Sequence, residues 1–306
     1  MQGKKKIIIV DPVHPILIKN LRKKNYKIDY KPGIKYSDLF RIIKFYSIII
    51  LRSGIKLDKT IINEGKNLKI IARAGVGMDN IDLPQAKKNK IKCFNVPAQS
   101  ASSVAELAFG LLHAASRKIV YCDRLLRKNL WKKSDMYGFE ITKKNLGIIG
   151  LGKIGKKIAL LGKRYGMNIY ANVKRNSLKR KKLLKRKKIF LLTLNQLLKK
   201  SDFVVVSVPL LKDTFNLINK KKLNLMKENS ILINVSRGGI VNENDLYSHL
   251  KIKKIFAAAS DVFLHEKRRN KLFKLNNTVI TAHIGAMTYE AQKRIAVELE
   301  KKIIKY

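Results

Sequence analysis

Three polar side chains follow successive strand-like segments in the second half of the chain. Arg237 lies in INVSRGGIV, Glu266 in SDVFLHE and His283 in TAHIGA. In an open α/β sheet the carboxyl ends of parallel strands meet at one edge, so we expect these segments to converge. A carboxylate beside an imidazole fixes the tautomer of the ring, and an arginine fork can hold a carboxylate or a carbonyl. The pattern predicts a proton-transfer pair accompanied by an orienting cation.

Each of these residues taken alone also has a purely structural explanation. Arg237 could be a strand-end surface charge, Glu266 a loop acid, and His283 a helix cap or a satisfied core histidine. The chemical interpretation is favoured because all three occur together beside a glycine-rich turn.

The glycine-rich turn lies in GIIGLGKIG, directly after an apolar run and before a helical pattern. Gly150 permits a tight turn, Gly152 lets the backbone approach a pyrophosphate, and Gly155 allows close packing of helix on strand. The following helix N-terminus supplies N–H donors for an anion. The spacing predicts a dinucleotide site, with three ordinary turn glycines as the alternative. His283 would then exchange the proton of a hydroxyl as hydride moves to or from a nicotinamide.

The segment IYANVKRNS, at residues 169–177, lacks an acid that such a site usually places about 20 residues after the turn to hold the adenosine ribose. Val173 stands at that position and is followed by Lys174 and Arg175. A valine cannot accept a hydrogen bond from the ribose 2′-hydroxyl, whereas either cation could reach a 2′-phosphate. We expect weakened discrimination, with use of NAD favoured over a full switch to NADP.

The charge of the chain is strongly positive, because 67 Lys plus Arg face 21 Asp plus Glu and give a formal net charge of +46. Such a balance raises the hypothesis of nucleic-acid binding. The lysines are scattered beside many Ile and Asn residues, which share AT-rich codons, so mutational drift is the favoured explanation. The block at residues 179–188, KRKKLLKRKK, is the best candidate for polyanion binding, and a solvated helix face is its alternative. No specific nucleic-acid partner is expected.

The cysteines and the apolar runs indicate a cytoplasmic protein. Cys93 and Cys122 have neither a disulfide framework nor metal-ligand spacing, so no metal is expected. Asp11 and Pro12 stop the first apolar run before it reaches the length of a signal peptide core. No apolar run approaches the ~18 residues of a membrane span.

Strand-like and helical patterns alternate along the whole chain. Short β-branched or apolar runs predict strands at residues 6–10, 47–51, 68–72, 91–96, 146–150, 168–173, 202–208, 230–235, 256–260 and 277–282. A long helical pattern at 100–128 separates the two series, and an amphipathic helix closes the chain at 288–306. This alternation predicts two parallel α/β units in sequence. The last helix is too short to be a domain alone, so we expect it to pack on the first unit.

Seven segments together resemble the D-isomer-specific 2-hydroxyacid dehydrogenase family. They are RAGVGMDNIDL (73–83), SVAELAFG (103–110), LGIIGLGKIG (146–155), VPLLKDT (208–214), INVSRGGIV (233–241), SDVFLHE (260–266) and TAHIGA (281–286). Within the family, the chain is most similar to the D-3-phosphoglycerate dehydrogenases, in a short form without a C-terminal regulatory domain. The resemblance implies a Rossmann NAD(P)-binding domain at residues 99–284, inserted into a flavodoxin-like substrate-binding domain formed by 1–98 and 285–306. Such proteins usually form homodimers through the Rossmann domain.

The resemblance also assigns roles to individual residues. The catalytic set of the family falls on Arg237, Glu266 and His283, and Asp261 falls on a contact to the nicotinamide carboxamide. The cofactor site is expected at Gly150, Gly152, Lys153, Ile154, Gly155, Val173, Lys174, Pro209, Ser236 and Asp261. The substrate site is expected at Arg52, Ser53, Gly75, Val76, Ser100 and Gln292.

Arg52 matters for substrate choice, because a phosphorylated substrate needs a cation that a small 2-hydroxy acid does not. Without the resemblance, a strand-end surface charge explains Arg52 equally well. The resemblance therefore implies interconversion of 3-phosphoglycerate and 3-phosphohydroxypyruvate, the first step toward serine. A glyoxylate or hydroxypyruvate reductase is the alternative within the family. A nucleic-acid-binding or protein-binding regulator of the same fold is an alternative of another class, and a degenerate, inactive relic is a third.

Three departures from the family pattern concern loops. Ser100 stands where the phosphoglycerate group can carry an Asn that touches substrate. Lys267 replaces a Pro that commonly follows the catalytic Glu, and Ala282 replaces a Pro that commonly precedes the His. These changes affect the expected loop rigidity more than the expected chemistry.

Overall fold

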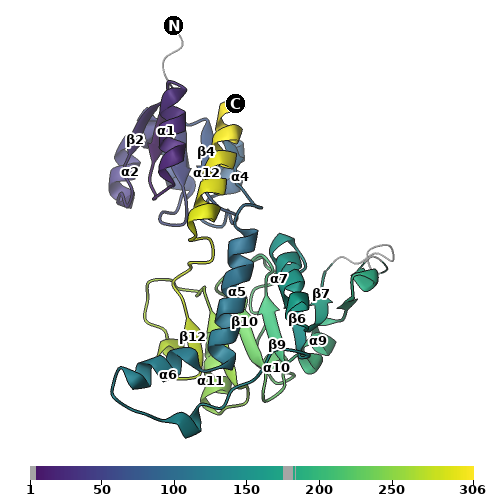
Figure 1. The fold of residues 1–306 in the computed structure, drawn as a ribbon. Coiled ribbons are helices and arrows are strands. Elements are labelled where there is room, and N and C mark those ends of the chain that lie inside the picture. The colour runs from purple at the N-terminus through teal and green to yellow at the C-terminus, as the bar shows by residue number, and fades with distance from the viewer. Residues whose placement is uncertain (1–4, 175–181, 183) are drawn as a thin grey trace. The chain divides into compact units, whose positions relative to one another are not determined.

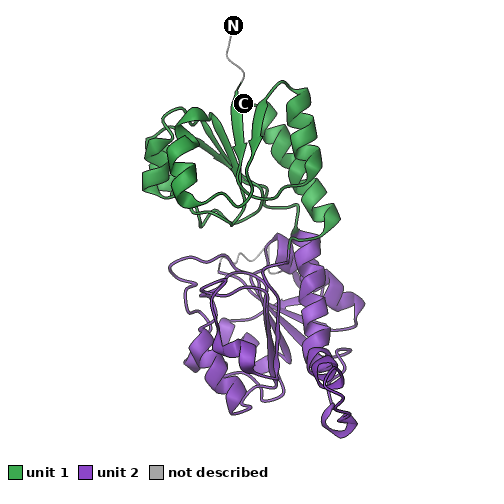
Figure 2. Ribbon diagram, turned by 90° about the vertical axis from the view of Figure 1, so that its left-hand side faces the viewer, with its two compact units in different colours: residues 1–100, 286–306 green, residues 101–285 purple. Residues whose placement is uncertain are grey.

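The computed structural model describes residues 5–174, 182 and 184–306, and the chain divides into two compact units (Figure 2). Unit 1 comprises residues 1–100 and 286–306, and unit 2 comprises residues 101–285. Each unit contains one sheet in which all strand pairs are parallel. The prediction of two α/β units, each built on a doubly wound parallel sheet, is confirmed.

Unit 1 has a five-stranded sheet of order β2-β1-β3-β4-β5. Its elements are β1 (Lys6–Ile9), α1 (Pro15–Lys23), β2 (Lys27–Tyr30), α2 (Tyr36–Ile42), η1 (Ile43–Phe45), β3 (Ile48–Leu51), α3 (Lys59–Glu64), β4 (Ile70–Arg73), α4 (Leu83–Lys88), β5 (Lys92–Phe94) and α12 (Tyr289–Ile304). This is the flavodoxin-like order, whose direction reverses between β1 and β3. Ligand crevices of such sheets lie outside the strand ends at this reversal point.

The central strands of unit 1 are isoleucine-rich because both of their faces are covered. Ile7 and Ile9 point into one core cluster and Ile8 into the other, as the two-residue period of a strand requires. Helix α12 packs beside α1 (Figure 1). Its residues Ile295 and Leu299 enter the same cluster as Ile7. The last helix therefore belongs to the core of unit 1.

Unit 2 has a seven-stranded sheet of order β12-β11-β10-β9-β6-β7-β8. Its elements are α5 (Ala101–Ser116), α6 (Ile119–Leu126), η2 (Lys133–Asp135), β6 (Asn145–Ile149), α7 (Lys153–Arg164), β7 (Asn168–Asn172), β8 (Ile189–Leu191), α9 (Leu194–Lys200), β9 (Phe203–Val206), α10 (Lys220–Leu223), β10 (Ile231–Asn234), α11 (Glu243–Lys251), β11 (Ala257–Ser260), η3 (Lys271–Lys274) and β12 (Thr278–Ile280). This is the Rossmann order with one further strand, and its direction reverses between β6 and β9.

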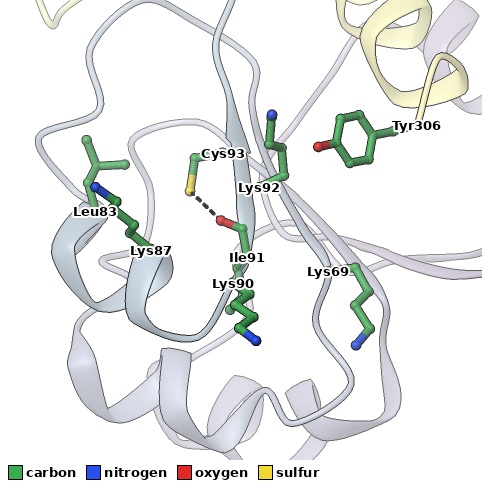
Figure 3. A pocket seen from close by; sticks show the side chains of 8 residues that line it. All are labelled: Lys69, Leu83, Lys87, Lys90, Ile91, Lys92, Cys93 and Tyr306. Atoms are coloured by element: carbon green, nitrogen blue, oxygen red, sulfur yellow. Dashed lines mark hydrogen bonds between the residues drawn. The ribbon is translucent and has the colours of Figure 1, made fainter.

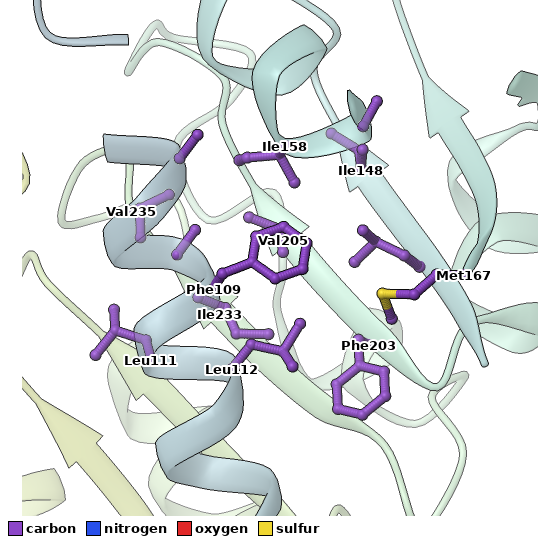
Figure 4. Packing of buried hydrophobic residues seen from close by; sticks show 14 of the residues in the cluster. Phe109, Leu111, Leu112, Ile148, Ile158, Met167, Phe203, Val205, Ile233 and Val235 are labelled. Atoms are coloured by element: carbon purple, nitrogen blue, oxygen red, sulfur yellow. The ribbon is translucent and has the colours of Figure 1, made fainter. Parts of the chain in front are cut away.

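The larger core cluster of unit 2 lies between α5, α7 and the central strands (Figure 4). Phe109 and Leu112 of α5 enter the same cluster as Ile148 of β6, Val205 of β9 and Ile233 of β10. The neighbouring residues of these strands enter a second cluster on the opposite face. Both faces of the central strands are therefore buried, and the carboxyl ends of these strands carry the candidate site.

Some predicted elements differ from those observed. The helical pattern at residues 100–128 is two helices, α5 and α6, because Lys118 between them has a left-handed backbone with φ of 53°. Strands β2 and β8 were not predicted, since both are short edge strands without a buried apolar run. Of the basic block at 179–188, residues 179–181 and 183 lie outside the described residues, as does Arg175.

The described residues contain no helix long and apolar enough to cross a membrane. Within the same ranges no group of three or more His, Cys, Asp or Glu side chains could hold a metal ion. Cys93 and Cys122 are free thiols.

Candidate active site

The glycine turn joins the end of β6 to the start of α7. Gly150 has φ of 95°, a backbone conformation that residues with a side chain rarely adopt. A Cβ on Gly155 would lie 2.1 Å from the Gly150 carbonyl oxygen, so close packing of helix on turn requires this glycine. At Gly152 a Cβ would meet nothing within 4 Å, and the glycine thus leaves open space before the first N–H groups of the helix. This cradle fits a pyrophosphate, which the N–H groups and the dipole of a 12-residue helix attract.

The loop after β9 is tied to this turn at the reversal point of the sheet. The Ser207 hydroxyl donates to the Gly150 carbonyl at 2.7 Å. Further along, the Thr214 hydroxyl donates to the Pro209 carbonyl at 2.7 Å and accepts from the Leu211 N–H at 2.7 Å. These bonds hold residues 209–214 in a compact turn beside the proposed pyrophosphate cradle.

The end of β7 holds an ion pair in place of the missing ribose acid. Val173 packs against the larger core cluster, and the Lys174 ammonium forms a salt bridge with the Asp213 carboxylate. The hydrogen bond from Lys174 lowers the pKa of Asp213. Lys174 is one of the two cations that could reach a 2′-phosphate, and in this structure its ammonium pairs with Asp213. Sequence reasoning missed Asp213, because nothing in VPLLKDT indicates a partner 39 residues away.

Two of the predicted catalytic side chains are in direct contact. His283 Nδ1 lies 2.7 Å from Glu266 Oε1, and the two side chains are 31% and 43% exposed. A neutral ring with its proton on Nδ1 donates to the carboxylate and leaves Nε2 to exchange a proton with a ligand. The partial exposure places this pair within reach of a substrate.

Asp261 holds the loop that carries His283. Its carboxylate is buried and accepts from the Thr281 hydroxyl at 2.6 Å and from the backbone N–H groups of Ile284 and Gly285, each at 2.8 Å. The Asp261 carbonyl accepts from the His283 N–H at 2.8 Å. His283 has φ of 54°, a left-handed conformation that such bonds must stabilise. The Asp261 carboxylate thus accepts three hydrogen bonds from this loop, and its contact to a nicotinamide stays a prediction.

The loop that carries Glu266 is anchored from the neighbouring helix α11. Glu243 accepts from the Leu264 N–H at 2.6 Å and from the Asn270 amide at 2.5 Å. Lys267 has φ of 67°, which a proline ring locked near −65° cannot adopt. The replacement of the family's proline therefore coincides with a backbone conformation that proline would not allow.

Arg237 lies on the loop after β10, close to the Glu266 loop. A Cβ on Gly238 would lie 2.0 Å from the Phe263 carbonyl carbon, so the two loops touch through backbone. Asn234 fixes the base of the Arg237 loop, since it accepts from the Ser236 hydroxyl at 2.9 Å and donates to the Arg237 carbonyl at 3.0 Å. The structure thus brings the Arg237 segment beside the segment that carries Glu266.

The predicted substrate residues belong to unit 1. Arg52 follows β3 at the reversal point of that sheet, where the buried Asp11 carboxylate accepts from the Arg52 N–H at 2.6 Å and the Gly54 N–H at 3.2 Å. The Arg52 guanidinium contacts Met287 Sδ at 2.8 Å. Burial lowers the pKa of Arg52, and the Asp11 carboxylate opposes this shift. Ser53 lies on the same loop.

The loop after the neighbouring strand β4 holds Gly75 and Val76. A Cβ on Gly75 would lie 2.1 Å from the Arg73 guanidinium, and the Asn95 amide donates to the Val76 carbonyl at 2.7 Å. Because β3 and β4 are adjacent and parallel, this loop and the Arg52 loop share one edge of the sheet.

Gln292 and Ser100 complete the predicted substrate set. The Gln292 amide donates to the Ala286 carbonyl at 2.7 Å, and the side chain of Ser100 is buried. Both residues belong to unit 1, where Gln292 is hydrogen-bonded and Ser100 is buried.

Comparison with known proteins identifies the family. The model of the D-isomer specific 2-hydroxyacid dehydrogenase, NAD binding domain, matches residues 109–285. A hydroxypyruvate reductase of Thermotoga maritima is 41% identical over 276 residues, which are 89% of this chain and 88% of the relative. This chain belongs to the D-isomer specific 2-hydroxyacid dehydrogenase family.

Other relatives of this dehydrogenase carry different names. A D-3-phosphoglycerate dehydrogenase of Methanocaldococcus jannaschii is 38% identical over 98% of this chain, which spans only 57% of that relative. The solved structure of an acyclic imino acid reductase in complex with NADPH and D-Arg is 30% identical, with a TM-score of 0.87 and coverage of 98% of this chain and 96% of that one. The family match and the relatives confirm the predicted family and its NAD-binding domain. The different names of the relatives leave the substrate open.

The dehydrogenase also has a basic pocket of about 440 Å³ in unit 1, at the edge strand β5 (Figure 3). It is lined by Lys69, Leu83, Lys87, Lys90, Ile91, Lys92, Cys93 and Tyr306. The Lys92 ammonium lies 5.1 Å from the centre of the Tyr306 ring, and burial raises the pKa of the Cys93 thiol. None of the predicted site residues lines this pocket.

Proposed function

We propose that this dehydrogenase interconverts 3-phosphoglycerate and 3-phosphohydroxypyruvate with a nicotinamide cofactor in the cytoplasm, as the first step toward serine. The observation that carries the substrate assignment is the position of Arg52. The Asp11 carboxylate accepts from the Arg52 N–H and fixes the backbone of this residue at the reversal point of the unit 1 sheet. A phosphate group calls for such a cation. The relatives named D-3-phosphoglycerate dehydrogenase support the same assignment.

The proposed chemistry uses the contacts of His283 and Glu266. In the oxidation direction, His283 Nε2 would take the proton of the substrate C2 hydroxyl as C2 gives up its hydride. Glu266, 2.7 Å from Nδ1, holds the ring in place and stabilises the imidazolium that forms. Arg237 orients the substrate carboxylate through its planar fork. In the reverse direction the imidazolium returns the proton to the carbonyl oxygen.

The cofactor would be held by the glycine turn and the neighbouring strand ends. Its pyrophosphate would lie before the N–H groups of Lys153 and Ile154, where Gly152 leaves open space. Bound there, the nicotinamide supplies or accepts the hydride. Pro209, Ser236 and Asp261 follow three strands of the same sheet and complete the proposed cofactor site.

Unit 1 would supply the substrate-binding residues. We assign Arg52 and Ser53 to the phosphate, and the Gly75–Val76 backbone to the carboxylate. Ser100 and Gln292 complete the set, and the substrate-binding domain corresponds to residues 1–98 and 285–306.

The proposed assembly is a homodimer formed through α6 and the segment after it. Helix α6 has no buried residue, while Trp131 and Tyr137 are 81% and 84% exposed. An exposed group of large apolar side chains is typical of a protein interface. Sedimentation of the purified protein tests this assignment, and a monomer at every concentration would contradict it.

The experiment that tests the function is a matrix of NADH and NADPH against 3-phosphohydroxypyruvate, hydroxypyruvate and glyoxylate. We expect the highest kcat/KM with 3-phosphohydroxypyruvate, and a loss of turnover by about 10²-fold or more in His283→Gln. Turnover of glyoxylate without turnover of the phosphorylated acid would refute the substrate and retain the family. Near-normal turnover by His283→Gln would remove that residue from its role.

The second candidate is a hydroxypyruvate reductase, which the 41% identity to the Thermotoga maritima protein of that name favours. Arg52 discriminates between the two. Arg52→Leu should raise KM for 3-phosphohydroxypyruvate by at least about tenfold and leave KM for glyoxylate within about twofold, because only the former carries a phosphate.

A further inference from the structure

We propose that Asp213, acting with Lys174, makes this dehydrogenase select NAD over NADP. The inference rests on the proposed function only in that a nicotinamide dinucleotide occupies the glycine turn. It does not depend on which 2-hydroxy acid is the substrate.

The ion pair lies at the reversal point of the unit 2 sheet. Lys174 is the second residue after β7, and Asp213 is on the loop after β9. Strands β7 and β9 are the two neighbours of β6, whose carboxyl end carries the glycine turn. The pair therefore joins the loops on either side of the turn, where the adenosine half of a dinucleotide would lie.

The two side chains take the place of the ribose-binding acid that is absent at Val173. An acid at the end of the second strand normally accepts from the ribose 2′-hydroxyl, and a nearby cation normally accommodates a 2′-phosphate. Here the acid comes from the loop after β9, and it holds the ammonium that would otherwise attract the phosphate. The Asp213 carboxylate can accept from a hydroxyl, whereas it repels the doubly charged phosphate of NADP.

The surroundings of the pair keep the carboxylate in place without burying it. Thr214 closes the turn at residues 209–214 through its bonds to Pro209 and Leu211. The Asp213 side chain is 45% exposed and that of Lys174 is 81% exposed, so a ligand can reach both. Because neither side chain is buried, substitutions at these positions should leave the fold intact.

The test is the binding of NADH and NADPH, measured by fluorescence titration of the full chain without substrate. We expect Asp213→Asn to lower the ratio Kd(NADPH)/Kd(NADH) by about fivefold or more, which is the scale of a charge-assisted contact in a partly exposed site. The gain arises because the carboxylate no longer opposes the phosphate and Lys174 is released to it. In Asp213→Asn/Lys174→Gln most of the gain should be lost.

Glu228→Gln is the matched control. Glu228 forms an exposed ion pair with Lys254 before the start of β10, and its removal changes the net charge by the same amount away from the glycine turn. It should leave the Kd ratio unchanged.

An unchanged ratio in Asp213→Asn, or an equal change of both Kd values, would overturn the inference. Failure of the proposed substrate appears only in turnover assays and leaves these titrations interpretable, so the two proposals can fail independently.

Discussion

At the residue scale, Asp261 is the connection between the sheet and the imidazole. Its buried carboxylate accepts the Thr281 hydroxyl and two N–H groups of the loop that carries His283. The Asp261 carbonyl accepts the N–H of His283 itself. The position of the proposed general base therefore depends on a side chain that the sequence suggested only as a cofactor contact.

Removal of one of these bonds should loosen the loop. We expect Thr281→Val to lower the free energy of unfolding by about 1–2 kcal/mol, because the substitution leaves the buried carboxylate one donor short. The kcat should fall with little change in KM for the cofactor. Urea denaturation and steady-state kinetics measure the two effects. Thr281→Ser retains the hydroxyl and is the control, and equal losses in the two variants would show that the hydroxyl is not responsible.

At the element scale, much of the fold was predictable because burial on both faces gives the central strands continuous apolar runs. The edge strands β2 and β8 escaped prediction, since a short edge strand needs no such run. The break between α5 and α6 was also missed, because Lys118 in a left-handed conformation has no sequence signature.

The candidate site was predictable only where it follows a strand. Arg237, Glu266 and His283 follow predicted strands, so the common edge of the sheet brings their segments together. Asp213 and Glu243 act through contacts between distant segments, and no local pattern reveals such pairs. Their roles had to be read from the folded chain.

The contact between the Arg237 and Glu266 loops gives a prediction for two glycines. Gly238→Ala would place a Cβ 2.0 Å from backbone of Phe263, and we expect a loss of about 1–3 kcal/mol in stability together with a lower kcat. Gly110→Ala meets nothing within 4 Å on helix α5 and should instead gain about 0.5–1 kcal/mol. Thermal unfolding of both variants measures the contrast. Equal effects would show that the two loops do not pack through backbone.

The edge strand β2 gives a prediction for pH dependence. The Tyr46 hydroxyl donates to Asp29 at 2.5 Å and lowers the pKa of that carboxyl; burial opposes the shift, and Lys6 and Lys27 lower the pKa further. Because the folded pKa of Asp29 lies below its unfolded value of about 3.9, its stabilisation is present above that pH and is lost as the pH falls through the folded pKa.

Tyr46→Phe should therefore destabilise the chain by about 1 kcal/mol at neutral pH, and the difference from the native protein should shrink below about pH 4. Urea denaturation over a pH series measures it. Tyr289→Phe, at a side chain that is 89% exposed, should show no difference at any pH. A cost of Tyr46→Phe that does not vary with pH would assign the effect to packing.

At the scale of the whole molecule, the +46 charge is the property least explained by the proposed function. The lysines are spread over both units, and the basic pocket at β5 is one local concentration of them. Charge of this kind attracts polyanions without reading their sequence, and it destabilises the compact state through self-repulsion.

The two explanations of this charge, drift and a nucleic-acid role, predict different binding to DNA. Incidental charge should give weak binding with equal affinity for unrelated duplexes, and the affinity should fall by orders of magnitude between about 50 and about 200 mM salt. Fluorescence anisotropy with two unrelated duplexes over a salt series measures both properties. We expect parallel salt dependence for the two duplexes and no change on addition of NADH. A preference for one duplex that persists at the higher salt would instead require specific contacts to bases, since phosphate contacts alone carry no sequence information. That outcome would favour a regulator of the dehydrogenase fold over an enzyme whose charge is a product of drift.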